Sequence, residues 1–487
     1  MNTQEAKKSI LFFIILFSFV LAFLFLTGCM THRGQFVDDH ETVTWTIDGL
    51  SSIISIFKGD IHIGRFRPLY VLFRICKKLA FGENFFLWHL WHAFLTALTG
   101  TLIFVWARLQ NLRTALSVLL VCLGLIGPQS EVWYRLGPQE IEGTLFLVLA
   151  LIAADQWLKS ASLNTPPRYS KAWCTCCIVS SVLSTWCKES FAVLVPVLMI
   201  YVVLLSVGLN SGSDSLFSKI LYAIRRTILF HVVLTVVTLI NAYIVIKKTT
   251  LLGIGYAGVD TKSGLNSYIY GTLQILTSDW IPFLLLLIGI VFCLALRIKN
   301  HSLHNGWLLI PAVLLVLSQL FIYNKSGMFG RYYLPFAFSL ILVWTAVFIN
   351  INEAIWTSVP VLYLIVCFFI YSISGAKDYA FNDQANGALM DFIESHIGPN
   401  SVVVVDHWAK ETCLSIEQYA SHDGLRCYFF GIDENADCYP LNDYPVDTPW
   451  DKKHSDYIIT NKLYDETPDG FCKIWEGDIW IVYQRKN

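Results

Sequence analysis

Apolar segments long enough to cross a bilayer recur through the first three-quarters of the 487-residue chain. A membrane-spanning helix needs about 20 such residues, and only 15% of this chain is charged, against about a quarter in soluble proteins. The sequence therefore predicts a polytopic α-helical membrane protein with about 11 transmembrane helices. The approximate spans are Ile10–Leu26, Phe85–Val105, Thr114–Ile126, Gly143–Trp157, Ala172–Trp186, Phe191–Leu209, Ile228–Ile246, Trp280–Leu296, Trp307–Tyr323, Tyr333–Ile349 and Ile355–Ile373.

Three of these segments, Thr114–Ile126, Gly143–Trp157 and Ala172–Trp186, are short for a full crossing. They are either complete short spans or parts of broken or strongly kinked helices. The choice changes the number of crossings, and with it the side of the membrane on which later loops lie.

Lysine and arginine in short loops predict the orientation of the spans, because cytosolic loops carry an excess of both. If the spans alternate, one side receives Lys7, Lys8, Arg108, Arg113, Lys159, Arg168, Lys171, Lys219, Arg225, Arg226, Arg297 and Lys299, and this side is the cytosol. The other, outer side receives Asp38, Asp39, Glu41, Arg65, Arg67, Arg135, Glu140, Glu142, Lys188, Glu189, Lys325 and Arg331. The convergence of separate motifs on one face predicts a functional site there.

The chain divides into two predicted domains. Residues 1–375 form the membrane domain, which includes a long outer loop at 28–84, and residues 376–487 form a small outer α/β domain. Its predicted helices and strands are Gln384–His396, Ser401–Asp406, Ala409–Ala420, Leu425–Phe430, Asp456–Thr460 and Ile474–Gln484. Outside the cytosol, one or two disulfides are expected among Cys413, Cys427, Cys438 and Cys472.

An acidic stretch follows the first span and places Asp38, Asp39 and Glu41 within a few residues of the membrane surface. Such a carboxylate can act as a general base that takes the proton of an attacking hydroxyl. The alternative is a solvated acidic loop or a helix cap, since aspartate favours both.

The same loop contains two predicted amphipathic helices, Ile47–Phe57 and Leu69–Leu79, which are expected to lie flat in the membrane interface. Arg74, Lys77 and Lys78 are expected on the polar side of the second helix. Before it stand Arg65 and Arg67, which suit either a substrate phosphate or the anionic headgroups of the bilayer.

Three further outer motifs carry charge. The loop Glu131–Glu142, with Arg135 and Glu140, is richer in special residues than a simple connector and is expected to face substrate. Lys188 and Glu189 sit between two spans, where they either line a wet cavity or satisfy each other. Arg331 is at the start of the next span. It suits a phosphate at the membrane surface, or its side chain simply extends to that surface by snorkelling.

Histidine and cysteine do not predict a metal site. His89 and His92 share one span, where a hydrogen bond to a neighbouring group is favoured over metal binding. Cys174, Cys176 and Cys177 open an apolar helix without an adjacent histidine, which favours packing in the core. No cofactor and no nucleic-acid partner is predicted, and dependence on a divalent metal is left open.

Together, these motifs resemble those of the integral-membrane glycosyltransferases of the C-type superfamily, which use polyprenyl-phosphate sugars. The resemblance covers about residues 1–373 and rests on Phe36–Asp39, Arg65–Leu69, Tyr134–Glu140, Lys188-Glu189 and Arg331–Pro335. Many members have Asp-Glu where this chain has Asp38-Asp39. Which carboxylate acts, and whether Glu41 shares the work, is therefore open.

Within the superfamily, the chain looks most similar to the serotype-converting O-antigen glucosyltransferases of enteric bacteria and their phages. This resemblance implies undecaprenyl-phosphate glucose as the donor and O-antigen, or another lipid-linked surface polysaccharide, as the acceptor. It implies a multi-pass protein of the bacterial inner membrane, with the active site and the C-terminal domain in the periplasm.

The resemblance also suggests roles for the charged residues. Asp38 or Asp39, with Glu41 nearby, would deprotonate the acceptor hydroxyl in an inverting displacement. The donor phosphate would be bound by Arg65, Arg67, Lys188 and Arg331. Other substrate contacts would come from Arg135, Glu140 and Glu189.

Two other function classes remain as alternatives. A multi-span lipid or polysaccharide transporter would more typically show charges near mid-membrane and paired halves, which the sequence does not display. A membrane-anchored assembly protein would not need the acidic loop or Arg65 and Arg67.

Overall fold

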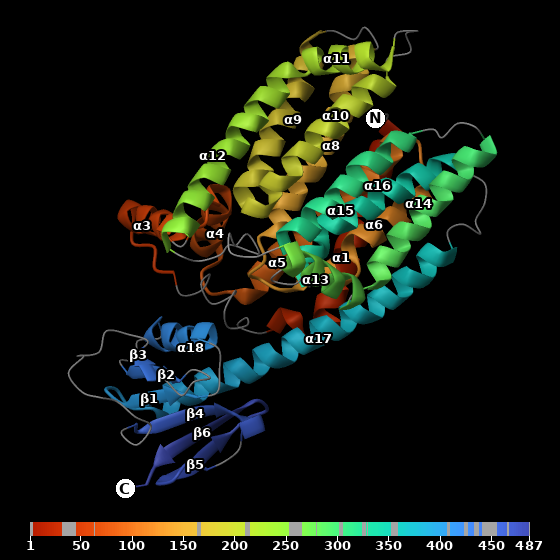
Figure 1. The fold of residues 1–487 in the computed structure, drawn as a ribbon. Coiled ribbons are helices and arrows are strands. Elements are labelled where there is room, and N and C mark those ends of the chain that lie inside the picture. The colour runs from red at the N-terminus through yellow and green to blue at the C-terminus, as the bar shows by residue number, and fades with distance from the viewer. Residues whose placement is uncertain are drawn as a thin grey trace.

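The computed structural model describes residues 3–31, 45–62, 64–162, 167–209, 215–252, 265–278, 280–300, 305–323, 328, 330–351, 359–406, 410–422, 427–432, 438–440, 455–464 and 467–486. Its helices form a bundle, and one long helix leads from the bundle to a small sheet domain (Figure 1).

Within the described residues, nine helical segments are long and apolar enough to cross a membrane. They contain α1 (Thr3–Thr27), α5 (Phe85–Leu109), α8 (Glu140–Ser162), α10 (Leu194–Gly208, preceded by η3, Glu189–Val193), α12 (Ile228–Leu252), α14 (Trp280–Asn300), α15 (Leu309–Tyr323), α16 (Leu334–Asn350, preceded by η5, Gly330–Tyr333) and α17 (Val359–His396). The prediction of a polytopic helical membrane protein is confirmed.

The three short predicted segments differ from one another in the structure. α6 (Thr114–Leu125) is followed by η2 (Pro128–Ser130) and α7 (Glu131–Tyr134), and the chain bends by 74° between them, as in a broken span or a re-entrant loop. α8 is instead one continuous helix of 23 residues, and α9 (Pro167–Cys187) is one of 21 residues.

α9 is too polar to be counted with the other spans, yet it lies along α8 inside the bundle (Figure 1). Its hydroxyl-bearing residues explain both facts. The Ser184 hydroxyl donates to the Gly143 carbonyl oxygen of α8 at 2.8 Å, and Ser180, Ser181 and Thr185 are buried. Small polar residues allow close packing between helices in a membrane, so α9 belongs to the bundle despite its low hydropathy.

Burial separates central from lipid-facing helices. In the most apolar window of the α16 segment, 89% of the residues are buried, against 17% in α1. Trp344 and Phe348 of α16 lie in the main apolar core, whereas Leu11 and Ile14 of α1 are exposed. Because lipid tails are apolar, an outward-facing apolar surface is what a spanning helix requires.

Two helices precede the second span: α3 (Leu50–His62) and α4 (Pro68–Phe81). The expected polar side of α4 contains Arg74 and Lys77, and both are buried, together with the apolar Tyr70, Val71 and Ile75. Leu72 and Leu79 are exposed. The buried side of α4 is therefore mixed, and its two cations have protein partners.

The C-terminal domain contains a six-stranded sheet in the order β3-β2-β1-β4-β6-β5, together with α18 (Lys410–His422). β1 pairs in parallel with β2 and β4, and β6 pairs antiparallel with β4 and β5. The strands are β1 (Val402–Val405), β2 (Tyr428–Ile432), β3 (Cys438–Pro440), β4 (Tyr457–Asn461), β5 (Phe471–Glu476) and β6 (Trp480–Arg485). The predicted single strand Ile474–Gln484 is wrong, because a turn at Gly477 divides it into a hairpin.

The predicted helix Gln384–His396 is the last part of α17, which runs for 38 residues without a break. Its end packs under the sheet, where Leu389 and Ile393 meet Val403, Ile459 and Val482. The last membrane span and the first helix of the sheet domain are therefore one element.

Three cysteines of the sheet domain, Cys413, Cys427 and Cys472, are free thiols, so the predicted disulfides are not formed among them. The side chain of Cys438 lies outside the described residues. Burial raises the pKa of the Cys427 thiol. We expect alkylation of the unreduced, denatured chain to label all three thiols, and Cys427 to react slowly at pH 8 in the folded protein. A disulfide-linked peptide between any two of them would contradict this prediction.

Candidate active site

Charged side chains gather at one end of the bundle, where α9 and α15 end and where α8 and α16 begin. We call this end the site face and the other end the opposite face. α3, α4 and the sheet domain lie on the same side of the bundle (Figure 1). The described charged residues of this cluster are Asp60, Arg67, Arg74, Lys77, Glu131, Arg135, Glu140, Glu142, Lys188, Glu189 and Arg331.

Glu140, the first residue of α8, lies between two cations. One of its carboxylate oxygens, Oε1, accepts a hydrogen bond from Lys188 and lies 3.9 Å from Nε of Arg331. The other oxygen, Oε2, accepts from the backbone N–H of Gln139 at 2.9 Å. Glu140 and Lys188 are buried, whereas the Arg331 side chain is 19% exposed. A single carboxylate thus fixes two cations, of which Arg331 is the partly exposed one.

Aromatic rings support these cations. The Lys188 ammonium lies 4.9 Å from the centre of the Tyr332 ring, and the Arg331 guanidinium lies 5.4 Å from it. Tyr332 stacks on Tyr323, the last residue of α15, with 4.4 Å between ring centres. Cation–π contacts of this kind stabilise desolvated positive charge, so the ring holds both side chains near the same place.

Glu189 and Arg67 form the second part of the cluster. Glu189 Oε1 accepts the Phe66 backbone N–H at 3.2 Å and lies 3.7 Å from Nε of Arg67. Arg67 also pairs with Asp60 of α3. Burial alone would lower the pKa of Arg67, but the two carboxylates outweigh burial and raise this pKa. Arg67 is therefore held as a fixed cation by protein carboxylates.

These contacts decide the role of the Lys188-Glu189 pair. The two side chains point to different partners, Lys188 to Glu140 and Glu189 to Arg67. The alternative in which they satisfy each other is wrong. Consecutive residues in extended and 3₁₀ conformation project in different directions, so the pair ties α8 to the loop before α4.

Glu131 joins the cluster to α7. Its carboxylate pairs with Arg135 and accepts the Arg331 backbone N–H at 3.1 Å. Gly330 has a φ of 53°, and a Cβ there would overlap the Glu131 carboxylate. Only glycine permits this approach at low cost, so its position fixes η5, and with it Arg331, against α7.

The buried cations of α4 anchor that helix to the cluster. Lys77 Nζ pairs with Glu142 Oε1 at 3.0 Å, and Arg74 donates to the Gly137 carbonyl oxygen at 2.8 Å. Burial lowers the pKa of Lys77, and the Glu142 carboxylate opposes that shift. These contacts hold α4 against the start of α8.

We expect Lys77→Met to destabilise the protein by about 3–5 kcal/mol, because Glu142 is then buried without its cation. The double variant Lys77→Met/Glu142→Leu should recover most of this loss, since no charge is left uncompensated. Lys78→Met is the matched control on the same helix, where the partly exposed pair with Glu83 at 3.4 Å is worth at most about 1 kcal/mol. Unfolding by denaturant in detergent measures all three, and equal effects of Lys77→Met and Lys78→Met would contradict the prediction.

The other predicted site residues can be placed as follows. Asp38, Asp39 and Glu41 lie outside the described residues, as does Lys325. Arg65 is exposed beside the cluster. Arg135, which pairs with Glu131 at the edge of the cluster, also lies over the Tyr379 ring of α17, with 5.7 Å between guanidinium and ring centre. The structure thus brings together Arg67, Arg135, Glu140, Lys188, Glu189 and Arg331.

Sequence reasoning missed two members of the site. Asp60 ends an amphipathic helix seven residues before Arg67, and the sequence showed no reason to pair them. Glu131 stood in the recognised outer loop but was not assigned a role. The described residues contain no group of three or more histidine, cysteine or acidic side chains able to hold a metal. His89 and His92 are fully buried in α5.

Comparison with known proteins supports the architecture. No protein-family model and no curated protein matches the sequence. The chain is similar to the crystal structure of ArnT from Cupriavidus metallidurans bound to undecaprenyl phosphate, with a TM-score of 0.53 and 11% identity over 96% of this chain and 97% of that one. The apo state of the same protein gives 0.52 and 13% over 98% of each chain. The fold is that of the C-type glycosyltransferases.

The expected C-type fold with its small C-terminal domain is thereby confirmed. At sequence identities this low, the similarity shows a shared fold only. Undecaprenyl phosphate is a ligand of the ArnT structure. A weaker likeness to the Archaeoglobus fulgidus oligosaccharyltransferase, with a TM-score of 0.47 and 12% identity over 86% of this chain and 64% of that one, carries no argument.

Proposed function

We propose that the chain is a glycosyltransferase that uses a polyprenyl-phosphate sugar as its donor. The observation that carries the proposal is the pair of cations, Lys188 and Arg331, held around Glu140 at the site face. Arg331 is partly exposed, and a guanidinium of this kind suits a phosphate group. A protein of the same fold binds undecaprenyl phosphate.

The reaction would be a single inverting displacement. The acceptor hydroxyl oxygen attacks the anomeric carbon, and the bond from that carbon to the phosphate oxygen breaks. The polyprenyl phosphate leaves with the bonding electron pair, and the hydroxyl proton passes to Asp38 or Asp39. Lys188 and Arg331 stabilise the charge that develops on the leaving phosphate, with Arg65 at the exposed edge.

The remaining site residues have positioning roles in this proposal. Glu140 and Glu189 keep Lys188, Arg331 and Arg67 in place, and Arg135 orients the loop through Glu131. The membrane domain is proposed to span residues 1–375, and residues 376–487 are proposed to hold the acceptor chain above the site.

The more specific form of the proposal names the substrates and the compartment. Glucose from undecaprenyl-phosphate glucose is transferred to O-antigen or another lipid-linked surface polysaccharide. The site lies on the periplasmic side of the bacterial inner membrane. The basic loops at the opposite face support this orientation, because such loops stay in the cytosol.

The test has two parts. The purified chain in lipid nanodiscs is given undecaprenyl-phosphate glucose and the lipid-linked polysaccharide, and we expect one polyprenyl phosphate released per hexose transferred, with inverted anomeric configuration. Surface polysaccharide is then analysed with and without the gene, and we expect loss of one hexose substituent. A transporter or an assembly protein would give no transfer in vitro, and unchanged substitution in cells would exclude the proposed acceptor.

A further inference from the structure

A polar cavity opens at the opposite face, far from the charged cluster. Its volume is about 350 Å³, and it lies between the ends of α5, α8 and α10 on one side and Asn305, Trp307 and the end of α16 on the other. Lys159 lines it, 19 residues after Glu140 on α8. At about 1.5 Å per residue, the cavity is about 28 Å from the candidate active site. It is therefore a separate site.

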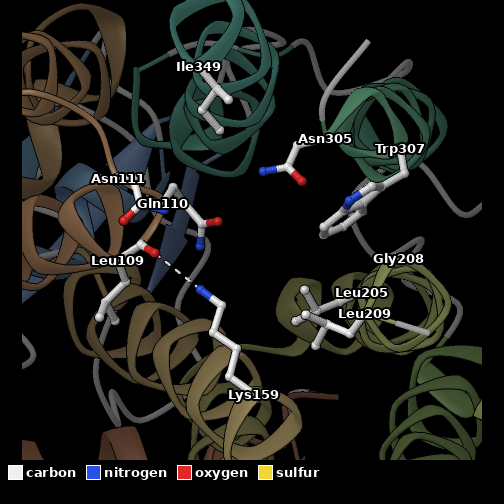
Figure 2. A pocket seen from close by; sticks show the side chains of 10 residues that line it. All are labelled: Leu109, Gln110, Asn111, Lys159, Leu205, Gly208, Leu209, Asn305, Trp307 and Ile349. Atoms are coloured by element: carbon white, nitrogen blue, oxygen red, sulfur yellow. Dashed lines mark hydrogen bonds between the residues drawn. The ribbon is translucent and has the colours of Figure 1, made fainter. Parts of the chain in front are cut away.

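Polar groups of different elements point into this cavity (Figure 2). The Lys159 ammonium, the Gln110 and Asn305 amides and the Trp307 indole surround the open space. Leu205 and Ile349 complete the wall with apolar surface. One cation, two amides and an indole N–H suit a ligand that has one anionic group and neighbouring hydroxyls.

A buried carboxylate holds this wall in place. Asp155 is fully buried and accepts hydrogen bonds from Gln110 Nε2 at 2.7 Å and from the Tyr201 hydroxyl at 3.2 Å. Lys159 lies 3.9 Å from the same carboxylate and donates to the Leu109 carbonyl oxygen at 3.1 Å. An ionisable group at this depth is costly, and here it fixes the donors that face the cavity.

The backbone is also adapted at this place. Asn111 and Asn305, which both line the cavity, have φ values of 63° and 56°. Asparagine tolerates this left-handed region better than other side chains. The two loops that close the cavity can therefore turn sharply and place amide groups at its rim.

A separate apolar crevice of about 30 Å³ lies along the same seam between helices. It is lined by Leu151, Leu198, Leu315 and Leu342, among others. Tyr201 stands between the two spaces, because it lines the crevice and its ring packs edge-on against Trp307 with 5.2 Å between centres. The polar cavity therefore ends at packed side chains, and its ligand group enters from the opposite face.

The surroundings indicate its charge. The opposite face carries Arg168 and Lys171 at the start of α9, and Arg225 and Arg226 at the end of α11 (Leu216–Arg226). α11 also exposes Leu216 and Phe217. Such a basic, amphipathic surface is attracted to a leaflet rich in anionic lipid.

We propose that this cavity binds the head group of an anionic glycerophospholipid from the leaflet at the opposite face. The lipid phosphate accepts a hydrogen bond from Lys159, its head-group hydroxyls pair with Gln110 and Asn305, and its acyl chains stay in the leaflet outside the cavity. This inference does not depend on the proposed transferase function.

Native mass spectrometry of the delipidated full chain with added phosphatidylglycerol or phosphatidylcholine tests the proposal. We expect one phosphatidylglycerol to bind in preference to phosphatidylcholine. Lys159→Gln should weaken phosphatidylglycerol binding about fivefold, which corresponds to about 1 kcal/mol per basic residue at an anionic surface. Gly208→Leu should also weaken it, because a Cβ at Gly208 already lies 3.5 Å from the Trp307 indole nitrogen and the rest of a leucine takes up part of the cavity.

Two controls separate binding from structure. Lys171→Gln removes an exposed cation of the same face and should leave binding unchanged. Lys159→Arg keeps a cation at the cavity, so binding should be retained. Equal loss in Lys159→Arg and Lys159→Gln, equal binding of the two lipids, or wild-type binding in Gly208→Leu would each overturn the proposal.

Discussion

Asp38→Asn and Asp39→Asn are expected to lower the rate of sugar transfer, and the variant that removes the catalytic base should lose roughly 10²–10⁴-fold. An amide cannot accept the hydroxyl proton, although it has nearly the shape of the carboxylate. Asp39 is six residues before Trp45, a distance of at most about 21 Å, and Trp45 packs with Tyr70 and Val71 of α4.

The measurement is single-turnover transfer from a polyprenyl-phosphate sugar in nanodiscs, which separates chemistry from product release. Asp48→Asn is the matched control, because Asp48 is an exposed carboxylate of the same loop. Glu41→Gln, measured in parallel, shows whether the third carboxylate takes part. Full activity of both Asp38→Asn and Asp39→Asn would remove the assignment of the base.

Arg331→Gln is expected to lower the turnover rate by roughly 10²–10³-fold, the cost typical of losing one group that stabilises charge in the transition state. The fold should persist, because the Arg331 side chain is partly exposed and Glu140 keeps its hydrogen bonds from Lys188 and Gln139. A lysine at this position should restore only part of the rate, since it lacks the planar fork of donors.

Arg113→Gln is the matched control for that variant, because Arg113 is an exposed arginine beside α6 at the opposite face. Thermal unfolding should give the same midpoint for wild type and both variants within a few degrees. A normal transfer rate in Arg331→Gln would show that the leaving phosphate is stabilised elsewhere.

The membrane fold could be predicted because its main signal is local. Twenty apolar residues in a row have few alternatives to a spanning helix, and this holds for α1, α5 and α14. α9 shows where prediction from hydropathy fails. Its serines lower the mean hydropathy of the segment, but they are buried against α8 and do not contact lipid. The break after α6 lies at Gly127-Pro128, a dipeptide that is typical of turns.

The contacts of the site could not be predicted, because each joins distant parts of the chain. Lys188 reaches Glu140 over 48 positions, and Arg331 reaches Glu131 over 200. Adjacency suggested that Lys188 pairs with Glu189, whereas backbone direction sends the two side chains apart. The burial of Arg74 and Lys77 of α4 could not be predicted either, because their partners, the Gly137 carbonyl oxygen and Glu142, come from the loop before α8 and from α8 itself.

The unbroken course of α17 sets the geometry of the sheet domain above the membrane. At about 1.5 Å and 100° per residue, its 38 residues form a strut about 57 Å long. Adding or removing one residue in its middle would swing the sheet around the helix axis by more than a quarter of a revolution. Adding or removing seven residues, close to two full turns, would keep the orientation of the sheet around the helix axis and change only its distance from the bilayer. The length of this one helix therefore fixes the distance between the sheet domain and the bilayer.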